Sequence, residues 1–372
     1  MADADPPIDA LAETLEVYRR RGEEWESVRS SNPAAAEFGS GLASIDRPVL
    51  DAGCGPGWDL PALGAPSIGL DAVEGFARRV RSWHPDAWPV VADLRALPFR
   101  RGSLGAAWVS RSLVHLPRVE VPLALWQLHR ALRIGAPVGL TLFEGDREHE
   151  RYPGDEFEGR RFSAWPEPLL RAVLEGSGFE VGNWTRASGD DRIDVRATRR
   201  LTLADTVGSG MELLLVGLNP SPYAAEVGVG FARPGNRFWP AALRAGVVTR
   251  DRDPYDALRR HGIGMTDLVK RPTARAAEIA RSEFRAGLER VEQVVRWLRP
   301  GAVCVIGVTG WRAATDQPAE FGVQPAPLGG RPVYVMPNPS GLNAHTNVDD
   351  LADHLRAALD LSRRAGSEPR PD

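Results

Sequence analysis

Short apolar runs rich in β-branched residues recur along this chain, and each ends at a turn that contains glycine, aspartate or asparagine. Five of them, within residues 48–143, alternate with stretches of helical spacing: PVLDAG, SIGLDA, WPVVAD, GAAWVS and PVGLTLF. Strands that alternate with helices form parallel sheets with helical layers, so this half is predicted to be built from βαβ units. ELLLVG, VCVIG and VYVM continue the pattern after a break. The sequence therefore predicts an α/β protein with two domains.

The break lies in ADTVGSG, residues 204–210, where we predict a linker. A chain of 372 residues is also longer than one typical domain. The expected domains are residues 1–203 and 211–362, followed by a disordered tail at 363–372 that ends in AGSEPRPD. Helix-like patterns cover three stretches, which are residues 166–184, Glu283 to Leu298, and VDDLADHLRAAL near the end.

Composition argues against several classes of protein. No apolar run approaches the roughly 18 residues that a membrane span requires, and the first residues lack the pattern of a secretion signal. Cys54 and Cys304 lie in apolar contexts without a Cys/His cluster, which disfavours a disulfide framework or structural zinc. We therefore expect a cytoplasmic protein with no metal and no membrane partner.

Charge divides unevenly between the two halves. From Met211 onward there are 21 basic and 18 acidic residues, which leaves 25 basic and 31 acidic residues before it. The second half is thus slightly basic within a chain of net charge −3, which is a weak indication of a DNA-facing surface.

A glycine-rich turn follows the first strand-like run, in VLDAGCGPGW. Its glycines let the backbone approach a nucleoside, and an acidic residue about 20 positions later can accept hydrogen bonds from both ribose hydroxyls. A third run ends in ADLRALPF, where an acid followed by apolar residues can hold the edge of an adenine. The predicted cofactor-binding residues are Asp51, Gly53, Gly55, Gly57, Asp71, Asp93 and Leu94.

These motifs, with WVSRSLVHL and HRALRIGAPVGLTLF, resemble those of class I methyltransferases of the small-molecule, UbiE-like branch over residues 18–198. The resemblance implies a Rossmann-like fold and S-adenosylmethionine as cofactor. A doubly wound domain that binds another nucleotide, or none, is the alternative. WVSRSLVHL lacks the Asn/Asp-Pro-Pro-aromatic motif, and no Pro-Cys nucleophile is present, so neither chemistry of base methylation is supported. The methyl acceptor stays unknown, and His115 is either a general base or a structural residue.

In the second half, two apolar runs are each followed by a loop that contains an Asn-Pro sequence. These loops extend from Gly217 to Trp239 and from Met336 to Thr346. Ligands gather at the carboxyl ends of parallel strands, so a site is expected where these loops lie. Neither loop holds an evident general base, because amides do not titrate near neutrality. Cleavage of the bond between a sugar and a nucleobase suits such a site, since the base departs as a resonance-stabilised anion.

Both loops resemble motifs of the mismatch-specific uracil/thymine DNA glycosylases of the uracil-DNA glycosylase superfamily, over residues 213–359. The similar segments are GLNPS, FARPGNRFW, GIGMTDLVKRPTARAAEI and NPSGL. The resemblance implies a three-layer α/β/α fold, a partner of mismatched duplex DNA, and no cofactor for this domain. The implied roles are catalysis by Asn219 and Asn338, base binding by Gly217, Leu218, Tyr223 and Phe231, and wedging of the duplex by Gly341 and Leu342.

Three departures leave the choice of base open. Ser221 stands where the family usually has glycine, Tyr223 is bulkier than the expected small residue, and residues 343–345 lack the arginine often found after the wedge. Lys270, the only lysine, lies outside both loops, so no amine is placed to form a Schiff base with the sugar. We expect a monofunctional glycosylase fused to a methyltransferase, and a monomer. The alternatives are a methyltransferase whose second domain only binds nucleic acid, and a first domain that only senses the cofactor.

Overall fold

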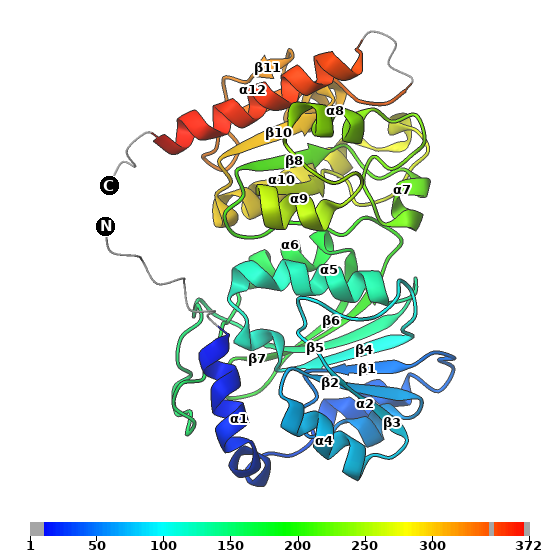
Figure 1. Ribbon diagram of the computed structural model, residues 1–372, viewed down its shortest axis with the longest axis vertical. Helices are drawn as coiled ribbons and strands as arrows, with labels where there is room; N and C mark the ends of the chain where they lie inside the picture. Colours follow the sequence, from blue (N-terminus) through cyan, green and yellow to red (C-terminus); the bar gives the residue numbers. More distant parts are fainter. Residues whose placement is uncertain (1–10, 342–345, 368–372) are drawn as a thin grey trace. The chain divides into compact units, whose positions relative to one another are not determined.

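The computed structural model describes residues 11–341 and 346–367 and divides the chain into two compact units (Figure 1). The first unit comprises residues 1–171 and 179–200, and the second comprises residues 172–178 and 201–372. Each unit contains one sheet, and each is described by itself below. In the described part of the chain, no helix is long and apolar enough to cross a membrane.

The first unit holds a seven-stranded sheet in the order β3-β2-β1-β4-β5-β7-β6. Its strands are β1 Val49–Ala52, β2 Ser67–Asp71, β3 Ala87–Val91, β4 Ala106–Ser110, β5 Pro137–Phe143, β6 Phe179–Arg186 and β7 Arg192–Arg199. The first five pair in parallel, and the last two are antiparallel. The chain order reverses between β1 and β4, and open sheets of this kind bind ligands at such a point. All five strand-like runs predicted in this half form parallel strands.

Helices surround this sheet in the first unit. They are α1 Ala12–Ser27, α2 Pro33–Ser40, α3 Leu60–Leu63, α4 Glu74–Trp83 and α5 Val121–Ala131. Helix α6, Glu167–Gly176, belongs to the first unit as far as residue 171 and to the second unit from residue 172. The expected helix over residues 166–184 is too long, because α6 ends at Gly176 and β6 begins at Phe179. Gly178 has a φ of 83°, a left-handed conformation that glycine adopts without strain, and the helix therefore stops there.

The second unit holds a five-stranded sheet in the order β11-β12-β10-β8-β9. Its strands are β8 Leu213–Gly217, β9 Ile263–Asp267, β10 Ala302–Ile306, β11 Gly322–Val323 and β12 Val333–Met336. All neighbours pair in parallel except β11, which is antiparallel to β12. Every residue of β8, β10 and β12 is buried, as continuous apolar runs predict for strands covered on both faces.

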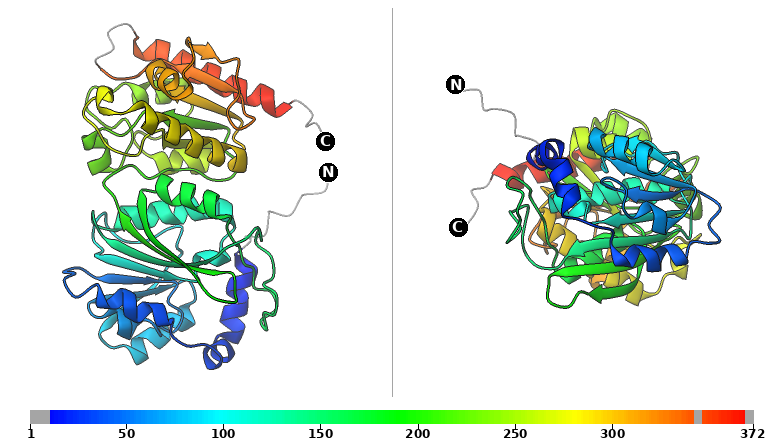
Figure 2. Two further views of the ribbon diagram at one scale, coloured as in Figure 1. Left: turned by 180° about the vertical axis from the view of Figure 1, so that it is seen from behind. Right: turned by 90° about the horizontal axis from the view of Figure 1, so that it is seen from below.

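Helices cover both faces of the second sheet, which gives the predicted α/β architecture (Figure 1, Figure 2). They are α7 Pro222–Val227, α8 Phe238–Ala245, α9 Pro254–His261, α10 Arg281–Leu298, α11 Val308–Thr315 and α12 Val348–Ser367. A buried cluster joins alternate residues of the strands to α8 and α12, for example Leu213, Trp239 and Leu351. In the rear view, α10 lies in front of the sheet (Figure 2).

The segment expected as a linker, residues 204–210, lies in the second unit. Thr206 exchanges two backbone hydrogen bonds with Met265 of β9, at 3.0 and 2.9 Å. At the other end, disorder was expected from residue 363, but α12 continues to Ser367. Arg363, Arg364 and Ala365 are good helix formers, which explains the extension. The rest of the expected tail, residues 368–372, lies outside the described residues.

Candidate functional sites

A cavity of about 430 Å³ lies at the carboxyl ends of β1, β2 and β4 in the first unit. Six of the seven predicted cofactor-binding residues line it, namely Asp51, Gly53, Gly55, Asp71, Asp93 and Leu94. Gly57 does not. A Cβ atom at Gly57 would lie 2.7 Å from Leu60 Cδ1 and 2.9 Å from His84 Cδ2, so this glycine is required by packing below the turn. Its contact with the cofactor stays a prediction.

Close packing around the glycine turn leaves no room for a side chain at Gly53. Its φ is 77°, and a Cβ atom there would lie 2.2 Å from Ser112 Cβ. Asp71, at the end of β2, accepts hydrogen bonds from the backbone nitrogens of Gly55 and Val73, both at 2.9 Å. These bonds fix the carboxylate beside the turn, at the place where a ribose would bind.

Buried carboxyl groups give this cavity a preference for a cation. Burial raises the pKa of Asp71 to about 6, although its backbone hydrogen bonds act in the opposite direction. Burial also raises the pKa of Asp51 well above its ordinary value, and the charges of Asp59 and Asp71 add to the effect. A positively charged ligand would relieve this repulsion and favour the ionised carboxylates. Asp93 is already held by Arg95, whose Nε lies 3.0 Å from each carboxylate oxygen.

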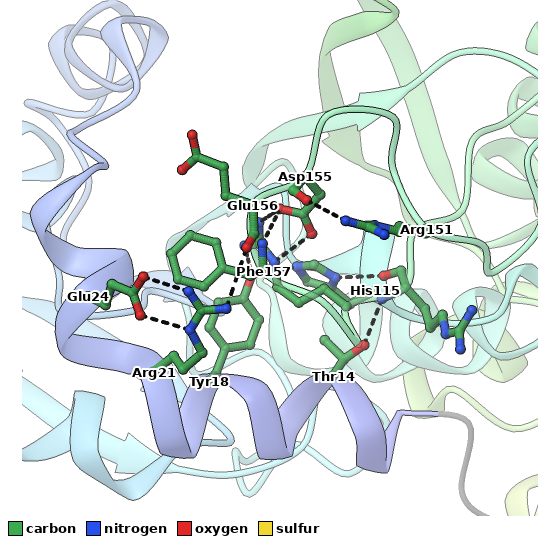
Figure 3. Close-up of polar contacts among 11 residues, drawn as sticks. Thr14, Tyr18, Arg21, Glu24, His115, Arg151, Asp155, Glu156 and Phe157 are labelled. Atoms are coloured by element: carbon green, nitrogen blue, oxygen red, sulfur yellow. Dashed lines mark hydrogen bonds and ion pairs between the residues drawn. The ribbon is translucent and has the colours of Figure 1, made fainter.

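Helix α1 closes one side of the cavity through a hydrogen-bonded chain that sequence reasoning missed (Figure 3). The Tyr18 hydroxyl lies 2.9 Å from His115 Nε2, and Arg160 Nη1 donates to the same hydroxyl at 3.0 Å. His115 Nδ1 lies 2.9 Å from the carbonyl oxygen of Arg161. Burial lowers the pKa of His115 to about 4, so the ring is neutral near pH 7 and donates through Nδ1. With both nitrogens occupied, His115 holds α1 in place, which matches the structural alternative.

Parallel pairing in the second unit brings the two asparagine loops to one edge of its sheet. Asn219 follows β8, Asn338 follows β12, and β10 lies between these two strands. The Asn219 side-chain nitrogen donates to the carbonyl oxygens of Pro220 and Arg271, at 3.2 and 3.1 Å, and to Thr273 Oγ1 at 2.9 Å. These three bonds orient the amide and leave Asn219 Oδ1 to accept a hydrogen bond, as a water-positioning role requires.

Asp267 is a buried carboxyl group next to this loop, and it was not among the predicted residues. It ends β9, directly opposite Gly217 in the parallel pairing with β8. A Cβ atom at Gly217 would lie 2.2 Å from Asp267 Oδ1 and 3.6 Å from the Phe231 ring atom Cζ. The carboxyl group and the aromatic ring therefore meet over the same glycine. Glycine is needed there because any side chain would displace the carboxylate.

The charge state of Asp267 is set by burial. Burial raises its pKa to about 6, while Lys270 and Arg290 lower it and Asp205 raises it. None of the described residues donates a hydrogen bond to its carboxylate. The cations are engaged elsewhere, because Lys270 Nζ and Arg290 Nη1 lie 2.8 and 2.9 Å from the Asp205 carboxylate oxygens. Asp267 is thus an ionisable group without a fixed partner, and it lies outside both loops, which themselves hold no evident general base.

Phe231 is held in an unusual backbone conformation, with a φ of 58°. Its ring packs on Phe238 with centroids 4.4 Å apart, and Trp239 Nε1 donates to the Gly230 carbonyl at 2.8 Å. Positive φ in a bulky residue is strained and often marks a functional site. One face of the Phe231 ring is therefore supported by the core, which suits a platform for a stacked base.

Arg237 joins the two loops. Its backbone nitrogen donates to the Pro339 carbonyl at 3.0 Å, and its guanidinium donates to the carbonyl oxygens of Ser340, at 2.7 Å, and Thr346. A single side chain thus holds both ends of the segment that includes the predicted wedge. Leu342 itself, and residues 343–345, lie outside the described residues. Gly341 is exposed and lies close to the first loop, since a Cβ there would be 2.9 Å from the Gly235 carbonyl oxygen.

The other predicted residues are spread around this edge. Asn338 is exposed, and its Oδ1 accepts a hydrogen bond from the Ser340 nitrogen at 2.9 Å. Leu218 packs toward α11, because a Cβ at Gly310 would lie 2.1 Å from its Cδ1. Tyr223 is 43% exposed on α7. Ser221, which departs from the family pattern, caps α7 by accepting a hydrogen bond from the Ala224 nitrogen at 3.2 Å.

The folds and the strand-end sites define a pair of α/β enzyme domains. Residues 205–361 match the model of the uracil DNA glycosylase superfamily, and residues 49–135 match that of a methyltransferase domain. The chain therefore contains a domain of each family, as the motifs indicated.

Solved structures similar to this chain include S-adenosylmethionine-dependent methyltransferases. One is a 1,6-didemethyltoxoflavin-N1-methyltransferase of Burkholderia thailandensis with bound 1,6-didemethyltoxoflavin and S-adenosylhomocysteine, at 19% identity and a TM-score of 0.43 over 54% of this chain and 93% of that chain. Another is a methyltransferase from Methanosarcina mazei, with 16% identity and a TM-score of 0.39, which covers 46% of this chain and 99% of that chain. A third is from Mesorhizobium loti, with 18% identity and a TM-score of 0.36, which covers 45% of this chain and 99% of that chain.

Proposed function

We propose that the second domain is a monofunctional DNA glycosylase that removes uracil from G·U mismatches in base excision repair, with thymine and other damaged pyrimidines as further candidate bases. One observation carries this proposal: the oriented amide of Asn219 and the unpartnered carboxylate of Asp267 lie at the ends of the neighbouring strands β8 and β9, and the supported ring of Phe231 lies beside Gly217 between them. These groups match what a flipped base and an attacking water need.

The reaction requires few protein groups. The C1′–N1 bond breaks with its electron pair leaving on the base, the sugar becomes cation-like, and the water oxygen then bonds to C1′. Asn219 Oδ1 accepts a hydrogen bond from that water and orients it. Ionised Asp267 stabilises the cation-like sugar and accepts the proton that the water loses. Asn338 and backbone N–H groups stabilise the departing anion, a role in which one donor commonly contributes roughly 3 kcal/mol.

Strand cleavage is not part of the proposed activity. A glycosylase that also nicks DNA needs an amine to form a Schiff base with the sugar. Lys270 is the only lysine, and its Nζ lies 2.8 Å from Asp205 with 10% of its side chain exposed. An amine paired and buried in this way is a poor nucleophile, which supports an abasic site as the final product.

The full-length chain should release uracil from a labelled duplex with one G·U pair and leave a strand that breaks only after alkali. Asn219→Ala should lower the rate roughly 100-fold, within the range expected for loss of a positioned catalytic group. Asn183→Ala, an exposed asparagine on β6, is the matched control. Duplex binding without an abasic product would instead favour a domain that only binds nucleic acid. Strand breaks without alkali would contradict the monofunctional assignment.

We infer that the first domain uses S-adenosylmethionine. Its sulfonium and ammonium groups supply the positive charge that the buried Asp51, Asp59 and Asp71 favour, and the Asp71 carboxylate beside the glycine turn is placed for the ribose hydroxyls. Calorimetry should detect binding of S-adenosylmethionine and of S-adenosylhomocysteine, and Asp71→Ala should weaken both. Binding without methyl transfer to any acceptor would favour the sensor alternative.

A further inference from the structure

The cavity of the first unit extends beyond the predicted cofactor residues into a region lined by aromatic rings. Phe143, Tyr152 and Phe162 contact one another, with ring centroids 4.9, 5.6 and 6.1 Å apart. His115 continues this surface, 4.6 Å from Phe162. Rings assembled in this way favour a flat, largely apolar ligand. The sequence motifs did not identify this surface, because Tyr152 and Phe162 lie outside the quoted segments and only the fold brings them beside Phe143 and His115.

Arg111 adds a positive charge to the same cavity. It follows β4, lines the cavity, and has a φ of 57°, which is strained for a residue with a side chain. Its backbone is fixed by a hydrogen bond from its nitrogen to the Thr141 carbonyl at 3.0 Å. Within residues 11–341 and 346–367, no group forms an ion pair or hydrogen bond with its guanidinium. An arginine that is partly buried and left without a partner is costly unless a ligand supplies the anion.

Asp59 is the acid whose charge acts most strongly on Arg111, and its carboxylate oxygens are already hydrogen-bonded. Asp59 Oδ1 accepts a hydrogen bond from the Asn32 nitrogen, and Asp59 Oδ2 accepts one from Trp108 Nε1, both at 2.7 Å. Burial lowers the pKa of Arg111, and the positive charges of Arg29 and Arg192 lower it further. Arg192 is itself ion-paired with Asp190, with 3.6 Å between Nη2 and Oδ2. Arg111 therefore presents to the cavity a guanidinium that no carboxylate of the described residues pairs with directly, and the charge of nearby Asp59 makes an anion of single charge a better fit than a phosphate dianion.

Size limits the acceptor further. A cavity of about 430 Å³ is at the lower end of the roughly 300–1,000 Å³ typical of small-molecule sites, and it must hold the cofactor as well. Helix α1 covers it, held by the Tyr18–His115 bond and by a hydrogen bond from the Arg161 nitrogen to Thr14 Oγ1 at 3.0 Å (Figure 3). A cavity of this size, with α1 along one side, suits a small-molecule acceptor better than a polymer such as DNA.

We propose that the methyl acceptor is a small aromatic or heteroaromatic carboxylic acid, whose carboxylate binds Arg111 and whose ring packs against Phe143, Tyr152 and Phe162. Guanidinium groups bind carboxylates through two parallel hydrogen bonds, which fixes the plane of the acid and hence of its ring. This inference rests on the proposed use of S-adenosylmethionine by the same cavity. It implies that the methyltransferase acts on a small molecule and not on the DNA bound by the second domain.

The test compares acids with their neutral amides on the full-length chain saturated with S-adenosylhomocysteine. Benzoate and quinoline-2-carboxylate, with benzamide and quinoline-2-carboxamide, are titrated by calorimetry. At least one acid should bind ten or more times more tightly than its amide. Arg111→Gln should abolish that preference, Arg111→Lys should retain part of it, and Arg78→Gln, an exposed arginine on α4, should leave it unchanged.

Equal binding of acids and amides, no binding of either acid, or a preference that survives in Arg111→Gln would overturn the proposal while leaving the cofactor assignment intact. Failure of S-adenosylhomocysteine itself to bind would instead overturn the proposed cofactor and the acceptor with it. The two failures are therefore distinguished in one experiment, since the first titration uses the cofactor product alone.

Discussion

Replacing Asp267 with asparagine should stabilise the second domain and abolish base excision at the same time. The pKa of Asp267 is raised to about 6 from 3.8 because the group is buried. The folded state therefore holds the proton more tightly than the unfolded state. Protonated Asp267 contributes fully to the stability of the fold below the pKa of the unfolded state, and this contribution is lost as the pH rises through the folded-state pKa of about 6. At pH 7.5 the ionised carboxylate costs up to roughly 3 kcal/mol, which the neutral amide avoids.

The pH dependence makes this prediction specific. At pH 4.5 most of Asp267 is protonated in the folded state, so the stability difference between the variant and the natural chain should narrow to about 1 kcal/mol. Base excision should change in the opposite sense. The natural chain should be roughly ten times slower at pH 5 than at pH 7.5, because about a tenth of Asp267 is then ionised. Asp267→Asn should be slow at both.

Scanning calorimetry of the full chain at the two pH values measures the first effect, and a uracil-release assay from pH 5 to 8 measures the second. Asp316→Asn is the control, because Asp316 is an exposed acid of the same domain with 61% of its side chain accessible. An Asp267→Asn protein that is no more stable at pH 7.5 than the natural chain would refute an ionised, buried carboxylate. A variant that keeps the full rate would refute its role in the reaction.

Other substitutions probe the same groups. Gly217→Ala should lower the excision rate at least 10-fold, since its Cβ would displace the Asp267 carboxylate, and single-turnover kinetics measures this. Arg237→Gln removes the guanidinium bond to Ser340 and should weaken binding to mismatched duplex several-fold, which fluorescence anisotropy detects. Binding of S-adenosylmethionine should tighten between pH 5 and 7.5, because the cation favours ionised Asp71, whose pKa is about 6. Calorimetry at both pH values measures this change in affinity. The Asp71→Asn variant should bind with the same affinity at both pH values.

The strands were predictable where they are apolar and end at a marked turn. All five parallel strands of the first sheet, and β8, β10 and β12 of the second, are such runs. Burial on both faces requires that composition in the inner strands, whereas the edge strand β3 is partly exposed. Strand β9, IGMTD, was not recognised, since Gly264 and Thr266 interrupt its apolar character. The predicted helix over residues 166–184 wrongly included the first part of the antiparallel strand β6, because the apolar residues of that strand continue the spacing of those in α6. In both segments the local sequence favours a strand only weakly, and pairing with a neighbouring strand determines the structure.

The missed strand explains the missed carboxyl group. Sequence reasoning placed the site in two loops and found only amides there, whereas Asp267 comes from a third segment that pairs with β8. A signal was present, because SIGLD and VVAD in the first half are also short runs that end at an aspartate, and IGMTD ends in the same way. The aromatic surface and Arg111 had no comparable signal. Their proximity arises from long-range folding and not from spacing along the chain.

The two domains place similar carboxyl groups in similar positions, and their hydrogen bonds separate their roles. Asp71 and Asp267 each end a strand that pairs in parallel with the strand before a glycine-containing loop, and burial raises the pKa of each to about 6. Asp71 has both oxygens fixed by backbone N–H groups. Asp267 receives no hydrogen bond from the described residues. A carboxylate fixed by amides is suited to hold a ligand, whereas one that is buried and left free is suited to take up a proton. We therefore propose that the same strand-end position serves binding in one domain and chemistry in the other.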